Sequence, residues 1–317
     1  MPLGITLPLR PSVSVFTLFA GISASTFLPE KEPMPELPEV ETIARTLRPQ
    51  VENRIITAAH VLLPKTLVAG GEFLSTAFPA EIRGVWRRAK LLFLDVAVGG
   101  AEAGLCHLAF HLKMTGKLFV HEAGAPPHKH TRMVFDLAPG GNLPAGRLFF
   151  DDIRTFGYCR FMRPEDLDAW PFWATLGPEP LTLAAEDFSR ALANRKASIK
   201  SLLLDQRVIA GIGNIYADEA CFRSGIHPGT VAGDISEKRR SALLRSVQDV
   251  LTESIAECGS SIRDYRDANG DAGAFQNMFR VYGRAGQGCV VCGTVLEKTV
   301  IAARTTVFCP HCQRRAG

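Results

Sequence analysis

The sequence predicts an α+β protein of several domains: an N-terminal helix with a β-sandwich, then a helical domain, then a cysteine-bearing β-hairpin. Three observations predict this order. Residues 51–163 hold short runs of β-branched and aromatic residues, broken by Gly and Pro clusters. From Ala184 onward, apolar residues recur with a helical period. The C-terminal segment carries two Cys-x2-Cys pairs.

The expected organisation is a 1–33 extension, a 34–163 domain, a proline-rich linker over 164–182, a helical domain over 183–276 and a hairpin module over 277–317. At 317 residues, more than one domain is the ordinary expectation. The clearest predicted strands are Lys90–Val98, Gly116–Val120, Met133–Leu137 and Leu148–Phe150. The predicted helices of the second domain are 186–194, 198–205, 215–224 and 236–258.

Charge is concentrated near the C-terminus. The whole chain has a net charge of only +4, which permits a polyanionic partner without requiring one. From Asn277 onward, six residues are basic and only Glu297 is acidic. The six are Arg280, Arg284, Lys298, Arg304, Arg314 and Arg315. This excess indicates a module that faces phosphates.

The eight cysteines fall into two groups. Four are scattered singly among apolar neighbours and are expected to be buried thiols: Cys106, Cys159, Cys221 and Cys258. The other four form two Cys-x2-Cys pairs separated by sixteen residues: Cys289, Cys292, Cys309 and Cys312. This spacing predicts one structural Zn²⁺ in a zinc ribbon, with two disulfides as the alternative. Metal thiolates favour a reducing compartment.

The segment Met34–Thr42 resembles the beginning of a protein, although it starts at position 34. Removal of Met34 would give Pro35 a free secondary amine, which can attack an aldehyde-like carbon; inside a peptide bond the same nitrogen cannot. Apolar spacing predicts a helix over 36–48, with Glu36 and Glu39 in or near its first turn. The alternative is an ordinary capped surface helix.

Residues 1–33 contain an apolar stretch, Val13–Ile22, preceded by Arg10 and followed by small residues. The stretch resembles a weak signal or transit peptide and is too short to span a bilayer. We expect an upstream start-codon assignment, with these residues absent from the mature protein. A cleaved targeting peptide is the alternative.

From Pro35 the chain reads Pro-Glu-Leu-Pro-Glu-Val-Glu and resembles the formamidopyrimidine-DNA glycosylase (MutM) family. The glycine-bearing turn before Asn214 predicts a capped helix start and a phosphate site, with a plain capped turn as the alternative. In the family, this segment is the helix–two-turn–helix motif that grips the DNA backbone. The match continues from Tyr216–Ala220 to Gly225–Pro228, and family-like blocks occur in order over residues 34–313.

The resemblance assigns roles to several basic residues. Lys90, at the start of an apolar strand, matches a phosphate contact and proton donor near the lesion sugar, whereas a lysine at a strand end usually only snorkels. Arg304 matches a residue that contacts the lesion phosphates and assists δ-elimination. His130, Lys196 and Asn214 match backbone contacts; for His130 and Lys196 the alternative is solvated surface charge.

Met114, Arg154 and Phe156 have shapes suited to filling the space left by an extracted base. The family resemblance implies that they intercalate, with Arg154 facing the orphaned cytosine, whereas Met and Phe are otherwise usually core residues. The polar segment 263–276 predicts a mobile loop, which in the family closes over the flipped purine. Ala274 stands where many relatives have Tyr, which leaves base recognition open.

The sequence therefore predicts a bifunctional DNA glycosylase and AP lyase with Pro35 as nucleophile and Glu36, Lys90 and Arg304 as further catalytic residues. It would act as a monomer on oxidised purines in damaged duplex DNA, in the bacterial cytoplasm near the nucleoid. One rival is an endonuclease VIII-like enzyme for oxidised pyrimidines, disfavoured by the Leu-Pro-Glu-Val-Glu opening and the long 263–276 loop. The other is a non-catalytic zinc-ribbon DNA-binding protein, if residues 1–33 stay attached.

Overall fold

The computed structural model describes residues 34–74, 76–99, 104–262 and 265–315. All of these described residues belong to one compact unit. The predicted extension over 1–33 lies outside the described residues, and the domain limits taken from the sequence stay predictions. No described helix has the length and apolar character needed to cross a membrane.

Helix α1 (Leu37–Val51) confirms the helix predicted over 36–48 and extends it by one turn. Glu36 is its N-cap residue and Pro38 lies in its first turn, where a missing N–H costs nothing. The alternative of a surface helix is wrong, because Leu37, Val40 and Ile43 are at most 1% exposed.

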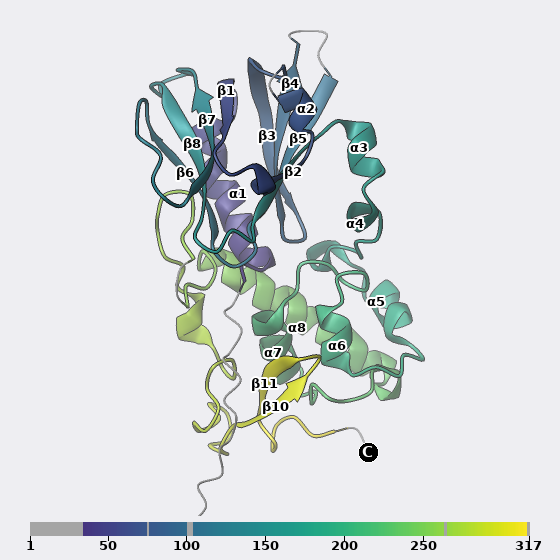
Figure 1. Cartoon of the computed structure of the whole chain (residues 1–317). Coiled ribbons are helices and arrows are strands. Elements are labelled where there is room, and N and C mark those ends of the chain that lie inside the picture. Colours follow the sequence, from purple (N-terminus) through teal and green to yellow (C-terminus); the bar gives the residue numbers. More distant parts are fainter. Residues whose placement is uncertain (1–33, 75, 100–103, 263–264, 316–317) are drawn as a thin grey trace, which may run out of the picture. The chain divides into compact units, whose positions relative to one another are not determined.

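The N-terminal strands form one sheet of nine strands in the order β2-β9-β5-β4-β3-β1-β7-β8-β6. Most neighbours are antiparallel, and β2 and β9 are parallel. Figure 1 shows the β1–β7–β8–β6 half facing the half around β3, β4 and β5. The strands are β1 (Ile55–Val61), β2 (Leu67–Ala69), β3 (Ala80–Arg88), β4 (Leu91–Val98), β5 (Gly104–His111), β6 (Gly116–Glu122), β7 (Thr131–Leu137), β8 (Gly146–Asp152) and β9 (Tyr158–Met162). A 3₁₀ turn, η1 (Pro64–Thr66), and a short helix, α2 (Gly71–Leu74), flank β2.

The core of this domain lies between the two halves of the sheet. The ring of Phe110 on β5 lies 6.1 Å from that of Phe135 on β7 and 5.3 Å from that of Phe150 on β8. From Val40 onward, the apolar face of α1 joins the same buried cluster. The predicted β-sandwich is therefore confirmed, and its two layers are parts of one continuous sheet.

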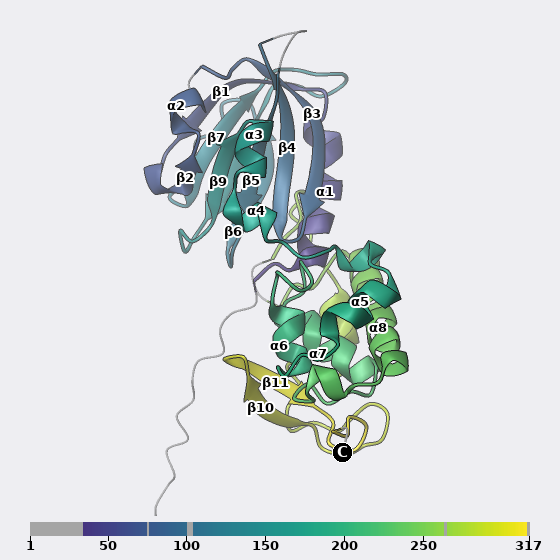
Figure 2. The ribbon, with the colours of Figure 1, turned by 90° about the vertical axis from the view of Figure 1, so that its right-hand side faces the viewer.

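Two short helices, α3 (Pro164–Asp168) and α4 (Pro171–Ala174), and a 3₁₀ turn, η3 (Pro180–Thr182), lie in the segment predicted as a linker. Figure 2 shows α3 and α4 over the face of the sheet that carries β4 and β5. There the stacked rings of Trp86 and Phe93, 4.1 Å apart, pack with Trp173. The prolines occupy the first positions of these short helices, so the segment contains regular turns and is not an irregular linker.

The second half of the described chain is helical, as predicted. Its helices are α5 (Ala185–Leu192), α6 (Ile199–Leu204), α7 (Asn214–Arg223) and α8 (Glu237–Ala256), with 3₁₀ turns η4 (Ala232–Asp234) and η5 (Phe275–Met278). They share a second buried cluster, to which Leu37 of α1 also belongs. Helix α1 thus begins in the helical core and continues into the β-sandwich core.

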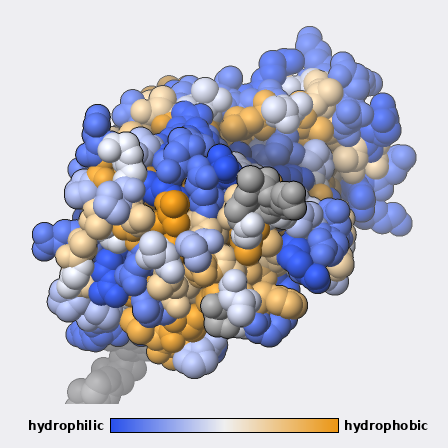
Figure 3. Space-filling view, turned by 90° about the horizontal axis from the view of Figure 1, so that it is seen from above, coloured by the Kyte–Doolittle hydropathy of each residue, from blue (hydrophilic) through white to orange (hydrophobic). Residues whose placement is uncertain are grey.

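The chain ends in an antiparallel hairpin of β10 (Glu297–Ile301) and β11 (Arg304–Phe308). Its turn places Ala302 and Ala303 at positive φ, which brings Arg304 directly opposite Ile301. On the face of the molecule that Figure 3 shows from above, hydrophobic and hydrophilic residues are mixed, as is ordinary for a folded chain.

Candidate active site

The Glu36 carboxylate is bound by the start of α7. Its two oxygens accept hydrogen bonds from the backbone N–H groups of Gly213, at 2.7 Å, and Ile215, at 3.0 Å. These are free donors at a helix N-terminus, where an anion is favoured. Glycine is required at 213, because a Cβ there would lie 2.7 Å from Oε2 of Glu36 and closer still to the rest of the carboxylate.

This arrangement corrects one sequence prediction. Asn214 was expected to cap α7, yet Gly213 is the N-cap residue and Asn214 is the first residue of the helix. The donors predicted to hold a phosphate instead hold Glu36, which is distant in the sequence. The side-chain Nδ2 of Asn214 donates to the Thr305 carbonyl at 3.0 Å.

Burial raises the pKa of Glu36 from 4.5 to about 7, against the lowering influence of Lys90 and of the two N–H donors. The side chain is only 3% exposed. Burial disfavours the charged form of a carboxyl group, so the protonated and ionised forms are both available near neutral pH. Pro35, the preceding residue, is also buried.

Glu39 fixes the first turn of α1. Its carboxylate accepts four hydrogen bonds: from the N–H of Glu36, at 2.9 Å, the Tyr216 hydroxyl, at 2.5 Å, and both the N–H and hydroxyl of Ser260, at 2.8 Å each. The carboxylate is 2% exposed and belongs to a helix that otherwise packs in apolar cores. Glu39 therefore joins the Pro35–Glu36 end of the chain to α7 and to the segment after α8.

Lys90 lies in the turn between β3 and β4 and is 8% exposed. Glu179 holds this turn, because its carboxylate accepts the N–H of Ala89 at 2.6 Å and pairs with both Arg87 and Arg88 at 2.9 Å. Ala89 has a positive φ of 54°, which this ring of contacts maintains. Burial lowers the pKa of Lys90.

The charges that act on Lys90 define the site. Glu36 and Glu39 raise its pKa, whereas Arg304 and Lys113 lower it further. All four groups are therefore within electrostatic reach of the Lys90 ammonium. The charges of two other sequence-predicted catalytic residues, Glu36 and Arg304, therefore act on Lys90, and Pro35 precedes Glu36 in the sequence.

Lys113 was missed by the sequence analysis. It has a positive φ of 53°, and its ammonium lies 5.5 Å from the centre of the Tyr158 ring. Its backbone N–H donates to Nδ1 of His111 at 3.1 Å, and burial lowers the pKa of both residues. The only sequence signal was its position beside Met114 in the His111–Gly116 motif.

The residues predicted to fill the space of the extracted base, Met114, Arg154 and Phe156, lie on two turns that are bound by the same side chain. The buried carboxylate of Asp152 accepts hydrogen bonds from the Thr115 hydroxyl and from the N–H groups of Arg154, at 3.2 Å, and Gly157, at 2.7 Å. It thereby ties the Met114 turn to the Arg154–Phe156 turn.

In the second turn, the Arg154 guanidinium lies 4.9 Å from the centre of the Phe156 ring. Phe156 is 53% exposed and Met114 is half-buried, so neither is a fully buried core residue. The segment bends at Thr155, which has a positive φ of 57°.

The remaining sequence-predicted contacts lie at the surface. His130 is half-buried in the turn before β7, and its N–H donates to Nδ1 of His128 at 3.2 Å. Lys196 is exposed between α5 and α6, and Arg304 is exposed at the start of β11. None of these three has its side chain buried, so each is available to a partner.

Residues 263 and 264 of the predicted mobile loop lie outside the described residues. The described part is anchored: the Tyr265 hydroxyl donates to the Glu39 carbonyl at 3.2 Å, and the Ala268 N–H donates to the Thr46 hydroxyl at 3.1 Å. Ala274 pairs with Ser260 in an isolated bridge. Mobility of the loop stays a prediction.

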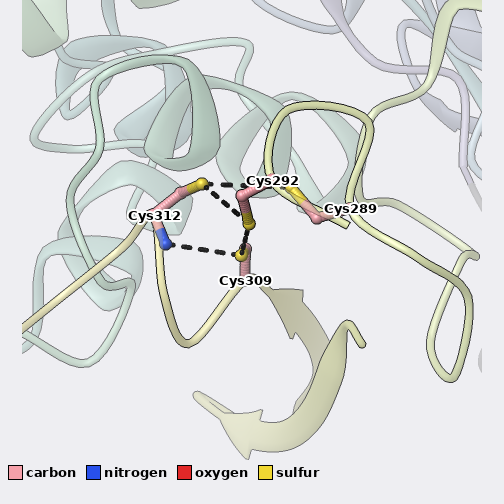
Figure 4. A group of neighbouring side chains, drawn as sticks. All are labelled: Cys289, Cys292, Cys309 and Cys312. Carbon is pink, nitrogen blue, oxygen red and sulfur yellow. Dashed lines mark hydrogen bonds between the residues drawn. The ribbon is translucent and has the colours of Figure 1, made fainter. Parts of the chain in front are cut away.

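The four hairpin cysteines converge, as Figure 4 shows, with all four sulfur atoms within 4.8 Å of one another. The Cys292–Cys309 and Cys292–Cys312 sulfur pairs are each 3.5 Å apart. A disulfide needs about 2.05 Å, whereas thiolates around one zinc ion lie about 3.8 Å apart in a tetrahedron with Zn–S near 2.3 Å. The cluster therefore fits a zinc ion and not two disulfides.

Of the other four cysteines, Cys106, Cys159 and Cys221 are buried as expected. Cys258 is exposed, which corrects the prediction. The helical period was extended to this position, but α8 ends at Ala256 and Cys258 lies in the following turn at a positive φ of 59°.

Three family models match consecutive parts of the chain. The model described as the formamidopyrimidine-DNA glycosylase N-terminal domain matches residues 34–159, and the formamidopyrimidine-DNA glycosylase H2TH domain matches 176–266. The model of a zinc finger found in FPG and IleRS matches 286–315.

Curated proteins and solved structures are similar to nearly all of the described chain. The formamidopyrimidine-DNA glycosylase of Nitratidesulfovibrio vulgaris is 61% identical, covering 89% of this chain and 100% of the relative. That of Carboxydothermus hydrogenoformans is 41% identical with the same coverage. The complex of Lactococcus lactis Fpg with DNA containing an abasic site has a TM-score of 0.79 at 31% identity, covering 88% of this chain and 100% of that chain. The wild-type Lactococcus lactis Fpg (MutM) complex with N7-benzyl-Fapy-dG DNA also has a TM-score of 0.79, at 32% identity, covering 89% of this chain and 100% of that chain.

Proposed function

Because the chain belongs to the formamidopyrimidine-DNA glycosylase family of DNA repair glycosylase/lyases, we propose that it excises oxidised purines, such as 8-oxoguanine and formamidopyrimidines, from duplex DNA. In this proposal the Pro35 amine forms a Schiff base, and β- then δ-elimination follows. The observation that carries the proposal is the buried Glu36 carboxyl, next to Pro35 in the sequence, with a pKa of about 7 on which the Lys90 ammonium acts.

The first step requires Pro35 to be the terminal residue, because the nitrogen of a peptide bond has a delocalised lone pair and only a free, unprotonated amine is nucleophilic. A terminal amine has a pKa of about 8, so a useful neutral fraction exists near pH 7. The nitrogen bonds to C1′ of the deoxyribose and loses its proton, while the bond from C1′ to the base breaks and the base leaves with the electron pair and takes up a proton. Opening of the C1′–O4′ bond then gives the iminium, and O4′ takes a proton from Glu36.

The iminium acidifies the C2′ position, and the Glu36 carboxylate formed in the previous step can accept that proton. The C3′–O3′ bond then breaks and its electron pair leaves with the 3′ phosphate. Loss of a C4′ proton and cleavage of the C5′–O5′ bond release the second phosphate, and water hydrolyses the iminium. Lys90 and Arg304 would bind the phosphates and stabilise the departing charge.

The proposed DNA contacts come from residues that are exposed or half-buried. Met114, Arg154 and Phe156 would fill the space of the extruded nucleotide, with Arg154 facing the orphaned cytosine. His130, Lys196 and Asn214 would bind backbone phosphates. The zinc ion, held by Cys289, Cys292, Cys309 and Cys312, would be structural, because four thiolates complete its coordination. The protein would act as a monomer on damaged duplex DNA in the bacterial cytoplasm, near the nucleoid.

Borohydride trapping tests the proposal. A chain beginning at Pro35 is incubated with an 8-oxoguanine duplex, a duplex with an oxidised pyrimidine and an undamaged duplex. The expected result is a covalent adduct on the 8-oxoguanine duplex whose modified peptide begins at Pro35. The matched control is a chain with one uncleaved residue before Pro35, which should bind DNA without an adduct.

Two outcomes would reject the proposal in different ways. Faster trapping on the oxidised pyrimidine would favour an endonuclease VIII-like activity; Lactococcus lactis Fpg itself has been crystallised with an oxidized pyrimidine containing DNA. DNA binding without any adduct by the Pro35 chain would leave only a non-catalytic DNA-binding role.

A further inference from the structure

The strand that carries Arg304 is fixed to the helical domain immediately after this residue. The Thr305 carbonyl accepts hydrogen bonds from Nζ of Lys200, at 3.2 Å, and Nδ2 of Asn214, at 3.0 Å. The Val307 N–H donates to the Asp218 carboxylate at 3.1 Å. Helices α6 and α7 thus hold the backbone of β11, which lies beside α7 in Figures 1 and 2.

We call these contacts of Lys200, Asn214 and Asp218 with β11 the clamp. Lys200 is at its centre and is fully buried, with 0% exposure. Its ammonium pairs with the Asp218 carboxylate at 2.6 Å and donates to the Thr306 hydroxyl at 2.7 Å. The Thr306 hydroxyl in turn donates to the carbonyl of Arg304 at 3.2 Å. A continuous chain of polar contacts therefore runs from the buried ion pair to the backbone of Arg304.

A buried ion pair is weak evidence for a stabilising role, since apolar residues of similar volume often serve as well. This pair is joined to one strand at consecutive residues, which suggests positional control instead. Helix α7 also holds the Glu36 carboxylate through Gly213 and Ile215. Helix α7 therefore carries both the backbone donors that bind Glu36 and the Asp218 carboxylate that binds the strand of Arg304.

We infer that Lys200 and Thr306 are positioning residues that set Arg304 for the second elimination. This inference rests on the proposed function, in which Arg304 binds the phosphate released when the C5′–O5′ bond breaks and its electron pair passes to the phosphate oxygen. The Schiff base and the first elimination use Pro35 and Glu36, which the clamp does not touch directly. Disturbing the clamp therefore slows δ-elimination selectively.

The test uses Thr306→Val, which replaces the hydroxyl by a methyl group of similar shape. Thr306→Ser keeps the hydroxyl. Thr299→Val makes the same change at the exposed residue that pairs with Thr306 across the hairpin. Each chain begins at Pro35 and is assayed on an abasic-site duplex for the ratio of β- to δ-elimination products, for borohydride trapping and for bound zinc.

Thr306→Val is expected to raise the β-to-δ ratio about tenfold, as a small displacement of a positioned group can cost this much or more. Trapping yield and zinc content should remain those of the unmodified chain, and Thr306→Ser and Thr299→Val should leave the ratio unchanged. Lys200→Met removes the ammonium at the start of the chain of polar contacts that leads to Arg304, and it should shift the β-to-δ ratio in the same direction by at least as much.

Three results would overturn the inference. An unchanged ratio in zinc-bound Thr306→Val would show that this chain of polar contacts does not act on Arg304. Loss of zinc in both Thr306→Val and Lys200→Met would show that the clamp serves hairpin folding. An equal loss of trapping and δ-product would place the residues in the first step. Failure of the unmodified chain to give any adduct would instead remove the proposed function itself.

Discussion

Replacing Gly213 by alanine tests whether the hydrogen bonds from α7 to the Glu36 carboxylate control the rate of excision. The backbone of Gly213 has a negative φ of −129°, so alanine suffers no conformational strain there. The added Cβ would nevertheless lie 2.7 Å from Oε2 of Glu36 and overlap the remainder of the carboxylate. Either Glu36 moves, or the start of α7 does.

The magnitude follows from the bonds at risk. Glu36 accepts two charge-assisted hydrogen bonds from α7, at 2.7 and 3.0 Å, each worth about 1.5–3 kcal/mol. Loss of one of them at the transition state slows excision about tenfold to a hundredfold, since about 1.4 kcal/mol is a factor of ten. The two donors also lower the Glu36 pKa, so their loss should move the pH–rate profile to higher pH.

Single-turnover excision from an 8-oxoguanine duplex, measured from pH 5 to pH 9, is the assay. Gly84→Ala is the matched control, because a Cβ there would meet only Asp95, with Oδ2 at 3.5 Å and Cβ at 3.9 Å, which are ordinary contact distances. Circular dichroism and zinc content confirm that both variants fold. A Gly213→Ala chain that is folded and excises at the unmodified rate would refute the argument that this close approach positions Glu36.

Three further predictions concern protonation, zinc and charge. Folding raises the pKa of Glu36 from 4.5 to about 7, so between these pH values the folded chain binds a proton that the unfolded chain does not, and the free energy of unfolding falls as pH rises through this window. In urea unfolding, the unmodified chain should lose up to about 3 kcal/mol more than Glu36→Gln between pH 4.5 and 7. Parallel plots of unfolding free energy against pH for the two chains would contradict the raised pKa. Removing zinc with a chelator should unfold the β10–β11 hairpin and abolish strand cleavage, with recovery on adding zinc back; cleavage that persists in zinc-free protein would count against a structural ion. Lys196→Gln should weaken binding to damaged and undamaged DNA alike and reduce the slope of log affinity against log salt by about one, because the exposed Lys196 is proposed to bind a backbone phosphate. An unchanged slope would mean that Lys196 contacts no phosphate.

Local sequence signals predicted much of the fold correctly. The apolar period predicted α1, α5, α6 and α8 because each buries one face; α7 was also predicted, although residues 215–222 are all buried. The cysteine spacing predicted a four-sulfur cluster because the ligand pairs lie in short turns. Both kinds of signal depend on neighbours within a few residues, where local geometry decides the outcome.

The errors arose where a distant part of the chain decides the local structure. Asn214 was predicted to cap α7 because capping is usually local, but the carboxylate of Glu36 satisfies the same donors from the other end of the described chain. The roles of Lys200 and Asp218 were missed because a buried ion pair has no local pattern. Lys113 was missed because its approach to Lys90 depends on the pairing of strands β4 and β5.

Helix α1 connects two cores, since Leu37 packs with the helical domain while Val40 and Ile43 pack with the β-sandwich. The Glu36 carboxyl thus belongs by sequence to the N-terminal domain and is held by α7 of the helical domain. Neither domain can be exchanged for a homologous one without redesigning the contact between Glu36 and α7. A chimaera assembled at the predicted linker should therefore bind DNA better than it cleaves it.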